Sequence, residues 1–360
     1  MEKCFRSSIF FFVFLLLSLS PQVFAASQGH YVPGGLSLRD NGMPPPGNYT
    51  LLVDPYYHAG RYKNTSGDDF KGFSSTGAST MDFTLLDHPI RVSTDGATSV
   101  DLKTKIDVTG NQWIQMWSPK EKILNAQYAF AIAPYIGYQR IRIDANANVS
   151  GVLHIGNNLS VPVQGQTSKK IIDDKYGIGD LYVRPLWLQW SGPHYDAGIN
   201  YGCFIPTGFY DHNDLANIGM GFLTNAFQNT TILYPLNNKA TALVLNSTYE
   251  INTKKYDLAF RPGSDLTFEY GVSQYLSHRL EIGASGYSQM QVSDDGGWVA
   301  ANKDKHREIH GVGGEINYWI VKGKVCAELR YTYEYGGKAT FQGHNGTFNF
   351  VYKWGAANEF

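Results

Sequence analysis

Residues 324–335, KVCAELRYTYEY, alternate between apolar and polar positions. Successive side chains of a pleated strand point to opposite faces, so this stretch predicts one apolar face that ends in tyrosines and one charged face. A strand of a soluble sandwich can also alternate in this way. A transmembrane barrel requires it, because lipid covers the outside, water fills the inside and neighbouring strands pair every backbone group.

The alternation recurs along the chain, which favours the barrel over the sandwich. We predict an antiparallel transmembrane β-barrel of about 12 strands, or about 14 if residues 152–163 also belong to its wall. The predicted strands are 48–62, 99–117, 127–143, 179–190, 195–205, 216–231, 240–251, 266–275, 279–291, 309–320, 324–335 and 347–354.

The predicted connections alternate in length. They are short after every even-numbered strand and longer after every odd-numbered one, with long polar loops expected at 63–98 and 144–177. The second of these contains an apolar alternation at 152–163 that can form a further hairpin above the membrane. Outer-membrane barrels have short periplasmic turns, long external loops and both chain ends on the periplasmic side. The sequence therefore predicts this orientation.

The chain begins with a secretory signal pattern. Lys3 and Arg6 precede the apolar run 9–19, and Val23-Phe24-Ala25 offers a cleavage site. The run is short for a membrane helix of about 20 residues, so we expect residues 1–25 to be removed. Residues 26–46 are rich in glycine and proline, which excludes a central strand and predicts a periplasmic lead-in or a segment in the barrel mouth. The barrel is expected at 47–354, followed by a tail at 355–360.

Composition narrows the class of protein further. The net charge of -1 over 360 residues gives no electrostatic footprint for nucleic acid. Aromatic residues make up 14% of the chain and charged residues only 17%, which suits an all-β protein with aromatic side chains at two interfaces. After signal cleavage only Cys203 and Cys326 remain. They fall on opposite faces of their predicted strands, so we expect them to stay unpaired.

Charged and amide side chains share the face opposite the apolar one, and we predict that they line the lumen. Arg or Lys facing lipid near the midplane would cost about 2–4 kcal/mol. They can form a salt-bridged plug or line a wet passage, and their mixed signs argue against strong ion selectivity. The candidates are Asp101, Lys103, Lys105, Asp107, Asp196, Asn200, Glu269, Glu281, Gln289, Glu315, Asn317, Glu328, Arg330, Glu334 and Lys353.

Two further clusters are candidate sites. Pro206, Thr207, Asp211 and His212 follow the fifth predicted strand and can fold inward as a constriction or form an ordinary Pro/Gly bend. His306, Glu308 and His310 share one strand face and make a weak candidate for a metal site, against a solvated rim as the simpler interpretation.

The sequence contains no recognised catalytic motif, neither a nucleophile elbow nor a phosphate-binding loop nor a zinc helix. We therefore expect no enzyme and no cofactor. An outer-membrane hydrolase would need a serine and a histidine brought together on the wall, and no pair near an acid fits the alternation.

Several segments resemble a known family when taken in order. HYVPGG, PPPGNYT, GIGDLYVRPLWLQW, FIPTGFYD and GYSQMQVSDDG are similar to the phenol meta-degradation (MetA-pathway) family, and the resemblance extends over nearly the whole mature chain. Members look like outer-membrane barrels and are regarded as transporters or channels. The family name records genes nearby for breaking down aromatic compounds, so the resemblance implies a barrel more strongly than it implies phenol.

These observations predict passive uptake of small hydrophobic or aromatic molecules across the outer membrane of a Gram-negative bacterium. The expected partners are the lipid bilayer, lipopolysaccharide, the small solute and the outer-membrane assembly machinery, which would read an aromatic residue at the end of the chain, Trp354 or Phe360. The alternative is a structural or adhesive barrel that transports nothing and acts through its external loops.

Overall fold

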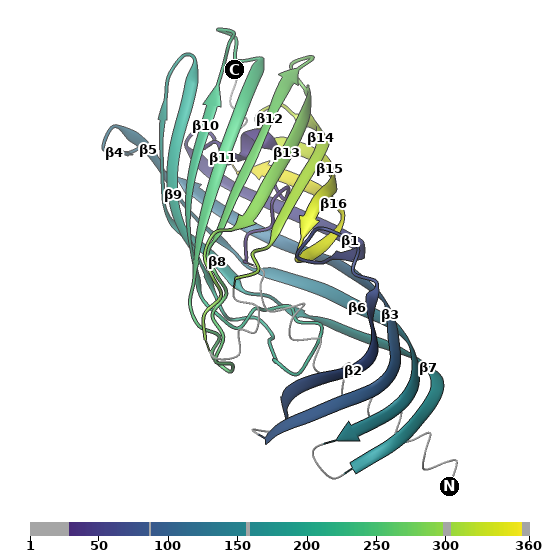
Figure 1. Ribbon diagram of the computed structural model, residues 1–360. Coiled ribbons are helices and arrows are strands. Elements are labelled where there is room, and N and C mark those ends of the chain that lie inside the picture. Colours follow the sequence, from purple (N-terminus) through teal and green to yellow (C-terminus); the bar gives the residue numbers. More distant parts are fainter. Residues whose placement is uncertain (1–28, 86–87, 156–158, 298–303, 355–360) are drawn as a thin grey trace.

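The computed structural model describes residues 29–85, 88–155, 159–297 and 304–354, and these form a closed antiparallel barrel of twelve strands (Figure 1). Strand β1 pairs with β16 on one side and β3 on the other, and Met116 of β3 pairs with Ala131 of β5 to complete the closure. The barrel strands are β1 (Gly47–Lys63), β3 (His88–Ser118), β5 (Ala126–Ala133), β8 (Leu181–Ser191), β9 (Tyr195–Ile205), β10 (Thr224–Leu233), β11 (Thr241–Asn252), β12 (Asp265–Tyr275), β13 (Leu280–Gln291), β14 (Glu308–Val321), β15 (Val325–Lys338) and β16 (Thr340–Lys353).

Strand β3 continues beyond one end of the barrel and forms a sheet there with three strands outside the barrel, at the lower right of Figure 1. In this extension β3 pairs with β2 (Gly72–Leu85) and with β6 (Tyr135–Ile155), and β6 pairs with β7 (Leu159–Ile178). The predicted long loop at 63–98 is therefore wrong. Glycine, serine and threonine dominate β2 and weaken the apolar alternation in its sequence, so the strand is recognised only from its pairing with β3. The hairpin expected around 152–163 is confirmed, outside the barrel.

We call the end of the barrel with the short links the turn end, and the opposite end the mouth. Links 192–194, 234–240, 276–279 and 322–324 lie at the turn end, and β4 (Lys122–Ile123) lies in the link between β3 and β5. Here β1 also begins and β16 ends, since the Trp354 N–H donates to the Asn48 carbonyl at 2.9 Å. The loops 206–223 and 253–264 lie at the mouth.

Each predicted barrel strand overlaps an observed barrel strand, and the count of twelve is confirmed. Several predicted boundaries are wrong. Strand β3 begins at His88 and not at residue 99, and the predicted strand 127–143 is divided between β5 and β6. Strand β10 begins at Thr224 and not at residue 216, because the Ala216 N–H is turned away to donate to Asp173 Oδ2 at 2.9 Å. Strand β16 begins at Thr340 and not at residue 347, because the end of β1 pairs with it; the long link predicted there is Ala339 alone.

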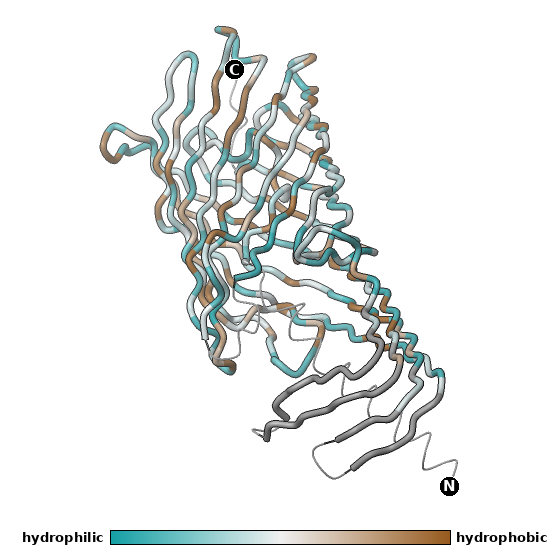
Figure 2. Tube along the Cα trace, viewed as in Figure 1, coloured by the Kyte–Doolittle hydropathy of each residue, from teal (hydrophilic) through white to brown (hydrophobic). Residues whose placement is uncertain are grey.

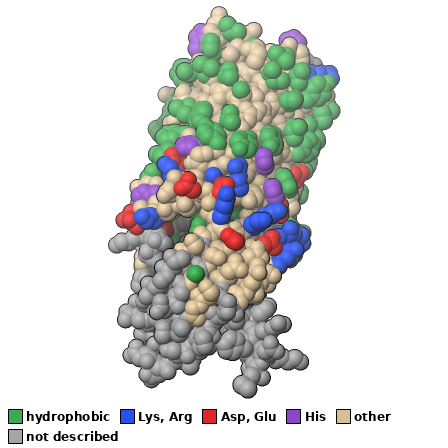
Figure 3. All heavy atoms as spheres, turned by 45° about the vertical axis from the view of Figure 1, so that its right-hand side comes forward, with side chains coloured by type: hydrophobic (Ala, Val, Ile, Leu, Met, Phe, Trp, Pro, Cys, Tyr) green, Lys and Arg blue, Asp and Glu red, His purple; other side chains and the backbone are tan. Residues whose placement is uncertain are grey.

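The outer face of the barrel is apolar. Ile316, Leu329 and Phe348 are direct neighbours across β14, β15 and β16 and are 52%, 55% and 49% exposed. Brown positions recur between teal and white ones along these strands in Figure 2, and Figure 3 shows apolar side chains over most of the barrel, bounded by a belt of charged ones. Among the described residues, no helix has the length and apolar character to cross a membrane. The apolar outer face is what a lipid environment requires.

The prediction that Asp101, Lys103, Lys105 and Asp107 line the lumen is wrong. Asp101, Lys103 and Lys105 are exposed on the outer face of β3, and Asp107 meets His58 there at 2.6 Å between Oδ1 and Nδ1. The opposite face of this part of β3 is the buried one, and it packs in an apolar cluster. Its buried members are Ala59, Val100, Leu102, Ile106, Ile141, Ile143, Ala145, Ala147 and Phe341. In this part of β3 the charged face points outward and the apolar face is buried, the opposite of the lipid-facing barrel wall. This is the arrangement of a surface in contact with water.

We expect a charge on the apolar outer face to destabilise the barrel. Leu329→Arg places a guanidinium in the middle of the exposed apolar row, which should lower the free energy of unfolding by about 2–4 kcal/mol. Denaturant unfolding in lipid vesicles measures this, with Asp101→Lys on the extension as a control expected to change it by less than about 0.5 kcal/mol. Equal stabilities of the two variants would contradict a lipid-facing surface.

Candidate functional site

The segment of residues 29–46, the N-terminal segment, lies inside the barrel. Proline and glycine keep it out of any strand ladder, so its backbone N–H groups are free to bind side chains of the wall. Its first residues contact the mouth and its 3-10 helix η1 (Leu38–Asn41) contacts the turn end. The segment therefore passes through the lumen for the length of the barrel.

At the mouth the segment is held by His30. The ring of His30 stacks on Phe204 with centroids 4.9 Å apart and meets the edge of Phe222 at 4.8 Å. Its two ring nitrogens are each 2.7 Å from an oxygen, Asp180 Oδ2 and Thr224 Oγ1. Asp180 also accepts the backbone N–H of Gly208 and Met220 at 2.9 and 2.8 Å. One carboxylate thus joins the segment to the loop 206–223.

The structure places the four predicted constriction residues at the surface side of that loop. Thr207 and Asp211 are exposed, while Pro206 and His212 are half-buried, and His212 Nδ1 lies 3.0 Å from Asp257 Oδ2. The buried residues of the loop come later in the chain, at Ala216 and Phe222. No periodic pattern marks them, since the loop is held by side chains of β7 and of the N-terminal segment.

A buried lysine lies in the same region, at the mouth. Lys255 in the loop 253–264 donates to Tyr210 Oη at 2.9 Å, and its ammonium lies over the rings of Tyr210 and Phe222. Burial lowers the pKa of Lys255 to about 8, against Asp257 and Asp180, which raise it. The ammonium is therefore charged at neutral pH and loses its charge as the pH rises through about 8.

From the mouth to the middle of the barrel, wall carboxylates accept hydrogen bonds from the segment. Glu250 Oε1 accepts the backbone N–H groups of His30 and Tyr31, both at 2.9 Å, and Glu269 Oε1 accepts the Tyr31 hydroxyl at 2.6 Å. A Cβ at residue 29 would lie 2.5 Å from oxygens of both Glu250 and Asp265, so a larger residue there would displace these carboxylates. The segment thus follows the acidic wall closely.

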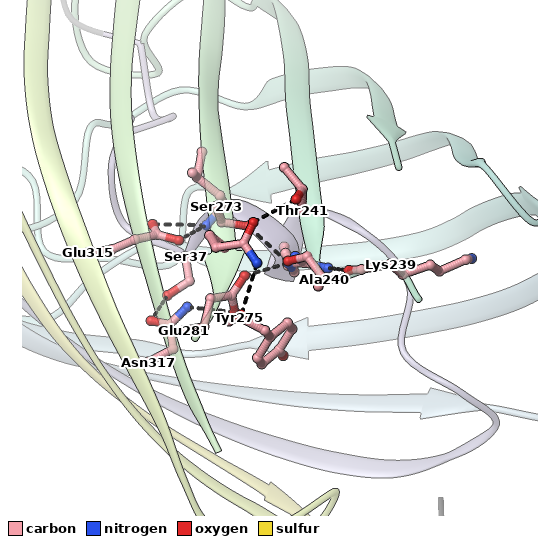
Figure 4. Close-up of polar contacts among 12 residues, drawn as sticks. Ser37, Lys239, Ala240, Thr241, Ser273, Tyr275, Glu281, Glu315 and Asn317 are labelled. Carbon is pink, nitrogen blue, oxygen red and sulfur yellow. Dashed lines mark hydrogen bonds and ion pairs between the residues drawn. The ribbon is translucent and has the colours of Figure 1, made fainter. Parts of the chain in front are cut away.

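At the turn end, Arg39 is the most extensively bonded residue of the segment. Its guanidinium donates to the carboxylate of Glu281, to Ser273 Oγ at 2.9 Å and to the carbonyls of Lys239 and Ala240 at 3.0 and 2.9 Å. The rings of Tyr234 and Tyr275 lie 5.7 and 4.7 Å from it. Figure 4 shows Ser273, Glu281 and Ala240 gathered at this point from three elements of the wall and its turn.

The residues beside Arg39 bind two more carboxylates. The Leu38 N–H donates to both oxygens of Glu315 at 3.1 and 3.0 Å, and the Ser37 hydroxyl donates to Glu328 Oε2 at 2.9 Å. Ser37 also lies 3.1 Å from Asn317 Oδ1, as Figure 4 shows. Three successive residues, 37 to 39, therefore bind the acidic side chains of β13, β14 and β15.

The other half of the lumen is apolar. Trp187 of β8 lies in a buried cluster against β1, β3 and β5, to which the segment adds Met43 and Leu36. The members are Met43, Tyr49, Leu51, Met116, Ala129, Ala131 and Trp187, with Leu36, Ile114 and Val351 packed against them. The lumen therefore has an acidic side, which holds the segment, and an apolar side.

The remaining lumen candidates fall on the inner face. Asp196 is half-buried near the turn end, where it accepts from the Tyr234 hydroxyl. The buried candidates are Asn200, Glu269, Glu281, Gln289, Glu315, Asn317, Glu328, Arg330, Glu334 and Lys353. Glu250, Asp265 and Arg307 also lie buried on this face, and sequence reasoning missed them. Glu250 continues the polar face of 240–251, so the same alternation could have found it.

The three residues of the weak metal candidate do not converge. His306 Nε2 lies 2.9 Å from Asp294, whereas His310 Nε2 lies 2.9 Å from Glu308, which also binds Lys338 Nζ at 2.6 Å. Within the described ranges no cluster of His, Cys, Asp and Glu could hold a metal ion, and Cys203 and Cys326 are free thiols.

The buried carboxylates outnumber the buried cations on the described inner wall. Arg330 forms an ion pair with Glu269 at 3.3 Å, and Arg307 forms one with Asp265 at 2.6 Å. The ion-pair partner of Glu281 is Arg39, which belongs to the segment and not to the wall. Glu250 Oε2 and Asp265 Oδ2 have no partner among the described residues. A lumen without the segment would therefore attract cations.

We predict that Arg39→Gln releases the segment. Removing one partner of a buried ion pair typically costs about 3–5 kcal/mol, because the other charge stays buried and unpaired. Arg39 is 16% exposed, so we expect a smaller effect, an increase of at least about tenfold in open probability or in proteolysis of residues 29–46. Arg61→Gln, at an exposed arginine, is the control. Restoration by the additional change Glu281→Gln supports the ion pair, and wild-type gating of Arg39→Gln would contradict it.

A second prediction concerns ion selectivity. A variant that lacks residues 28–43 should conduct cations in preference to anions, because the wall carboxylates lose the donors of the segment. Reversal potentials in a salt gradient measure the permeability ratio of K⁺ to Cl⁻. Glu281→Gln with Glu315→Gln in that variant should lower the ratio, whereas Asp101→Asn on the outer face should leave it unchanged. An anion-selective or unselective pore would refute the electrostatic account.

The chain is similar to the COG4313 outer membrane channel from Pseudomonas putida F1, with 13% identity and a TM-score of 0.54, over 88% of this chain and 99% of that one. At this identity the likeness shows the fold.

Other solved structures are less similar to this chain. They include the TodX deltaS2S3 mutant monoaromatic hydrocarbon channel (9% identity, TM-score 0.39, 92% and 96% covered) and the CymD monoaromatic hydrocarbon channel (8%, 0.38, 87% and 90%). No curated protein sequence matches the chain.

A family model matches residues 91–350, which is more than half of the chain and extends from β3 to β16. The chain therefore belongs to the family described as "Putative MetA-pathway of phenol degradation".

Proposed function

We propose that this protein is a channel for the passive uptake of small hydrophobic or aromatic molecules across the outer membrane of a Gram-negative bacterium. The observation that carries the proposal is the division of the lumen. A separate chain segment, held by side-chain contacts, fills the acidic side, and an apolar wall built around Trp187 faces it. A barrel whose own side chains filled it would need no such segment.

The orientation follows from the connections. Short links and both ends of the barrel wall lie at the turn end, which we assign to the periplasm, and the mouth and the extension then face outward. Lipid would surround the apolar outer face, and lipopolysaccharide would meet the charged belt beside it.

The alternative is a structural or adhesive barrel that does not transport. The extension favours it, because β2, β3, β6 and β7 carry the chain beyond the barrel, and β3 and β7 present charged side chains outward. In that function the lumen would stay closed under all conditions, and the N-terminal segment would be a permanent part of the core. Transport and adhesion therefore differ in whether the segment leaves.

Electrical recording of single molecules distinguishes the two functions. We expect the full-length protein in a planar bilayer to be closed with rare openings, and the variant lacking residues 28–43 to conduct steadily, because the segment occupies the lumen. Uptake of toluene into proteoliposomes should rise with the same deletion. A folded deletion variant that passes neither ions nor toluene would overturn the channel and favour the adhesive barrel.

A further inference from the structure

Two polar side chains stand out on the apolar side of the lumen. Trp187 of β8 and Asn200 of β9 are directly opposite each other in the ladder, and both face inward, at 3% and 7% exposed. Side chains opposite one another on antiparallel strands have Cβ atoms about 4.5–5.5 Å apart. The two side chains are therefore neighbours on the inner face of the wall.

Each side chain has one polar atom without a hydrogen-bond partner. The indole N–H of Trp187 and the amide oxygen of Asn200 are buried and have no hydrogen-bond partner in the part of the chain that the structure describes. One is a donor and the other an acceptor. A buried donor or acceptor without a partner loses its bonds to water and gains nothing in return, so such atoms are exceptional and call for a partner.

The neighbouring amides are already engaged and cannot supply that partner. Gln228, opposite Asn200 on β10, accepts from Arg184 and donates to Thr248, both at 2.9 Å. Gln189 accepts the backbone N–H of Met43 and donates to its carbonyl at 3.3 Å. The unpaired donor and acceptor are thus fixed between satisfied groups.

Apolar surface adjoins the pair. Trp187 packs with Met43, Met116 and Ala131 in the buried cluster, and the guanidinium of Arg184 lies 4.7 Å from its ring. This surface suits an aromatic or aliphatic body. A carboxylate is disfavoured by the excess of buried acids in the lumen. An ammonium group only donates, so it would leave the indole N–H unpaired.

We propose that Trp187 and Asn200 form a binding subsite for the hydroxyl group of a neutral solute with an apolar ring. The hydroxyl accepts from Trp187 Nε1 and donates to Asn200 Oδ1, while the ring lies on the apolar cluster. This subsite rests on the proposed uptake function and adds to it a preference for hydroxylated aromatic solutes over plain hydrocarbons.

Three probes of similar shape test the two hydrogen bonds separately. Phenol can donate and accept, anisole can only accept, and toluene can do neither. Their dissociation constants are measured with the full-length protein in detergent. Trp187→Phe should weaken phenol and anisole by about 2- to 10-fold, and Asn200→Leu should weaken phenol alone by the same factor. Toluene should change in neither variant, because the apolar surface remains.

Trp113→Phe, at a tryptophan that is 52% exposed, is the matched control and should change none of the three constants. The heat-dependent gel shift of folded barrels shows whether each variant is folded. The wild-type protein gives a test that needs no variant, since phenol should bind more tightly than the more hydrophobic toluene.

The outcomes separate the subsite from the uptake function. Toluene binding with an unchanged ratio of phenol to toluene in both variants, or tighter wild-type binding of toluene than of phenol, overturns the subsite and leaves the channel standing. Loss of all binding to the wild-type protein, together with a closed deletion variant, overturns both. Selective loss of phenol and anisole in Trp187→Phe, and of phenol alone in Asn200→Leu, supports the subsite.

Discussion

The structure depends on one constraint: every carboxylate buried in the barrel needs a hydrogen-bond donor or a cation beside it. Strands β12 to β15 direct Glu269, Glu281, Glu315 and Glu328 into the lumen, where water is scarce and an unpaired charge is costly. Arg330 forms ion pairs with Glu269 at 3.3 Å and with Glu315 at 4.0 Å, which leaves the other two carboxylates without it. The N-terminal segment supplies the missing donors, and its backbone N–H groups are available because proline and glycine exclude it from a ladder.

This constraint links the fold to the proposed function. The acidic wall holds the segment by ion pairs and hydrogen bonds, which can break one by one. The wall around Trp187 is built mainly of apolar side chains and offers few such bonds. Among the residues that the structure describes, no ladder hydrogen bond joins the segment to the wall, so its departure would leave the ladder of the barrel intact. Under the proposed function, an apolar solute would contact the apolar wall, and the unpaired polar atoms there would select for a hydroxyl group.

The pattern of the sequence predicts the wall of the barrel and little of what fills it. Alternation places Leu329 outside and Arg330 inside, because lipid and water demand opposite faces. The same alternation misplaces Lys103, since nothing in a period of two tells which face is outward once a strand has left the lipid. Strand β2 is not predicted because its many small polar residues weaken the alternation of apolar and polar positions. The role of Arg39 could not be predicted, because it depends on partners two hundred or more positions away in the sequence.

Amide hydrogen exchange of residues 29–46 in the lipid-embedded protein tests the central claim, that this segment is docked on the acidic wall. The amides of His30, Tyr31, Leu38 and Met43 donate to wall side chains. They should exchange slowly, in the manner of the adjoining strands, and faster when Glu250 or Glu315 is changed to alanine. Exchange at the rate of an unstructured peptide in the native protein would contradict the account.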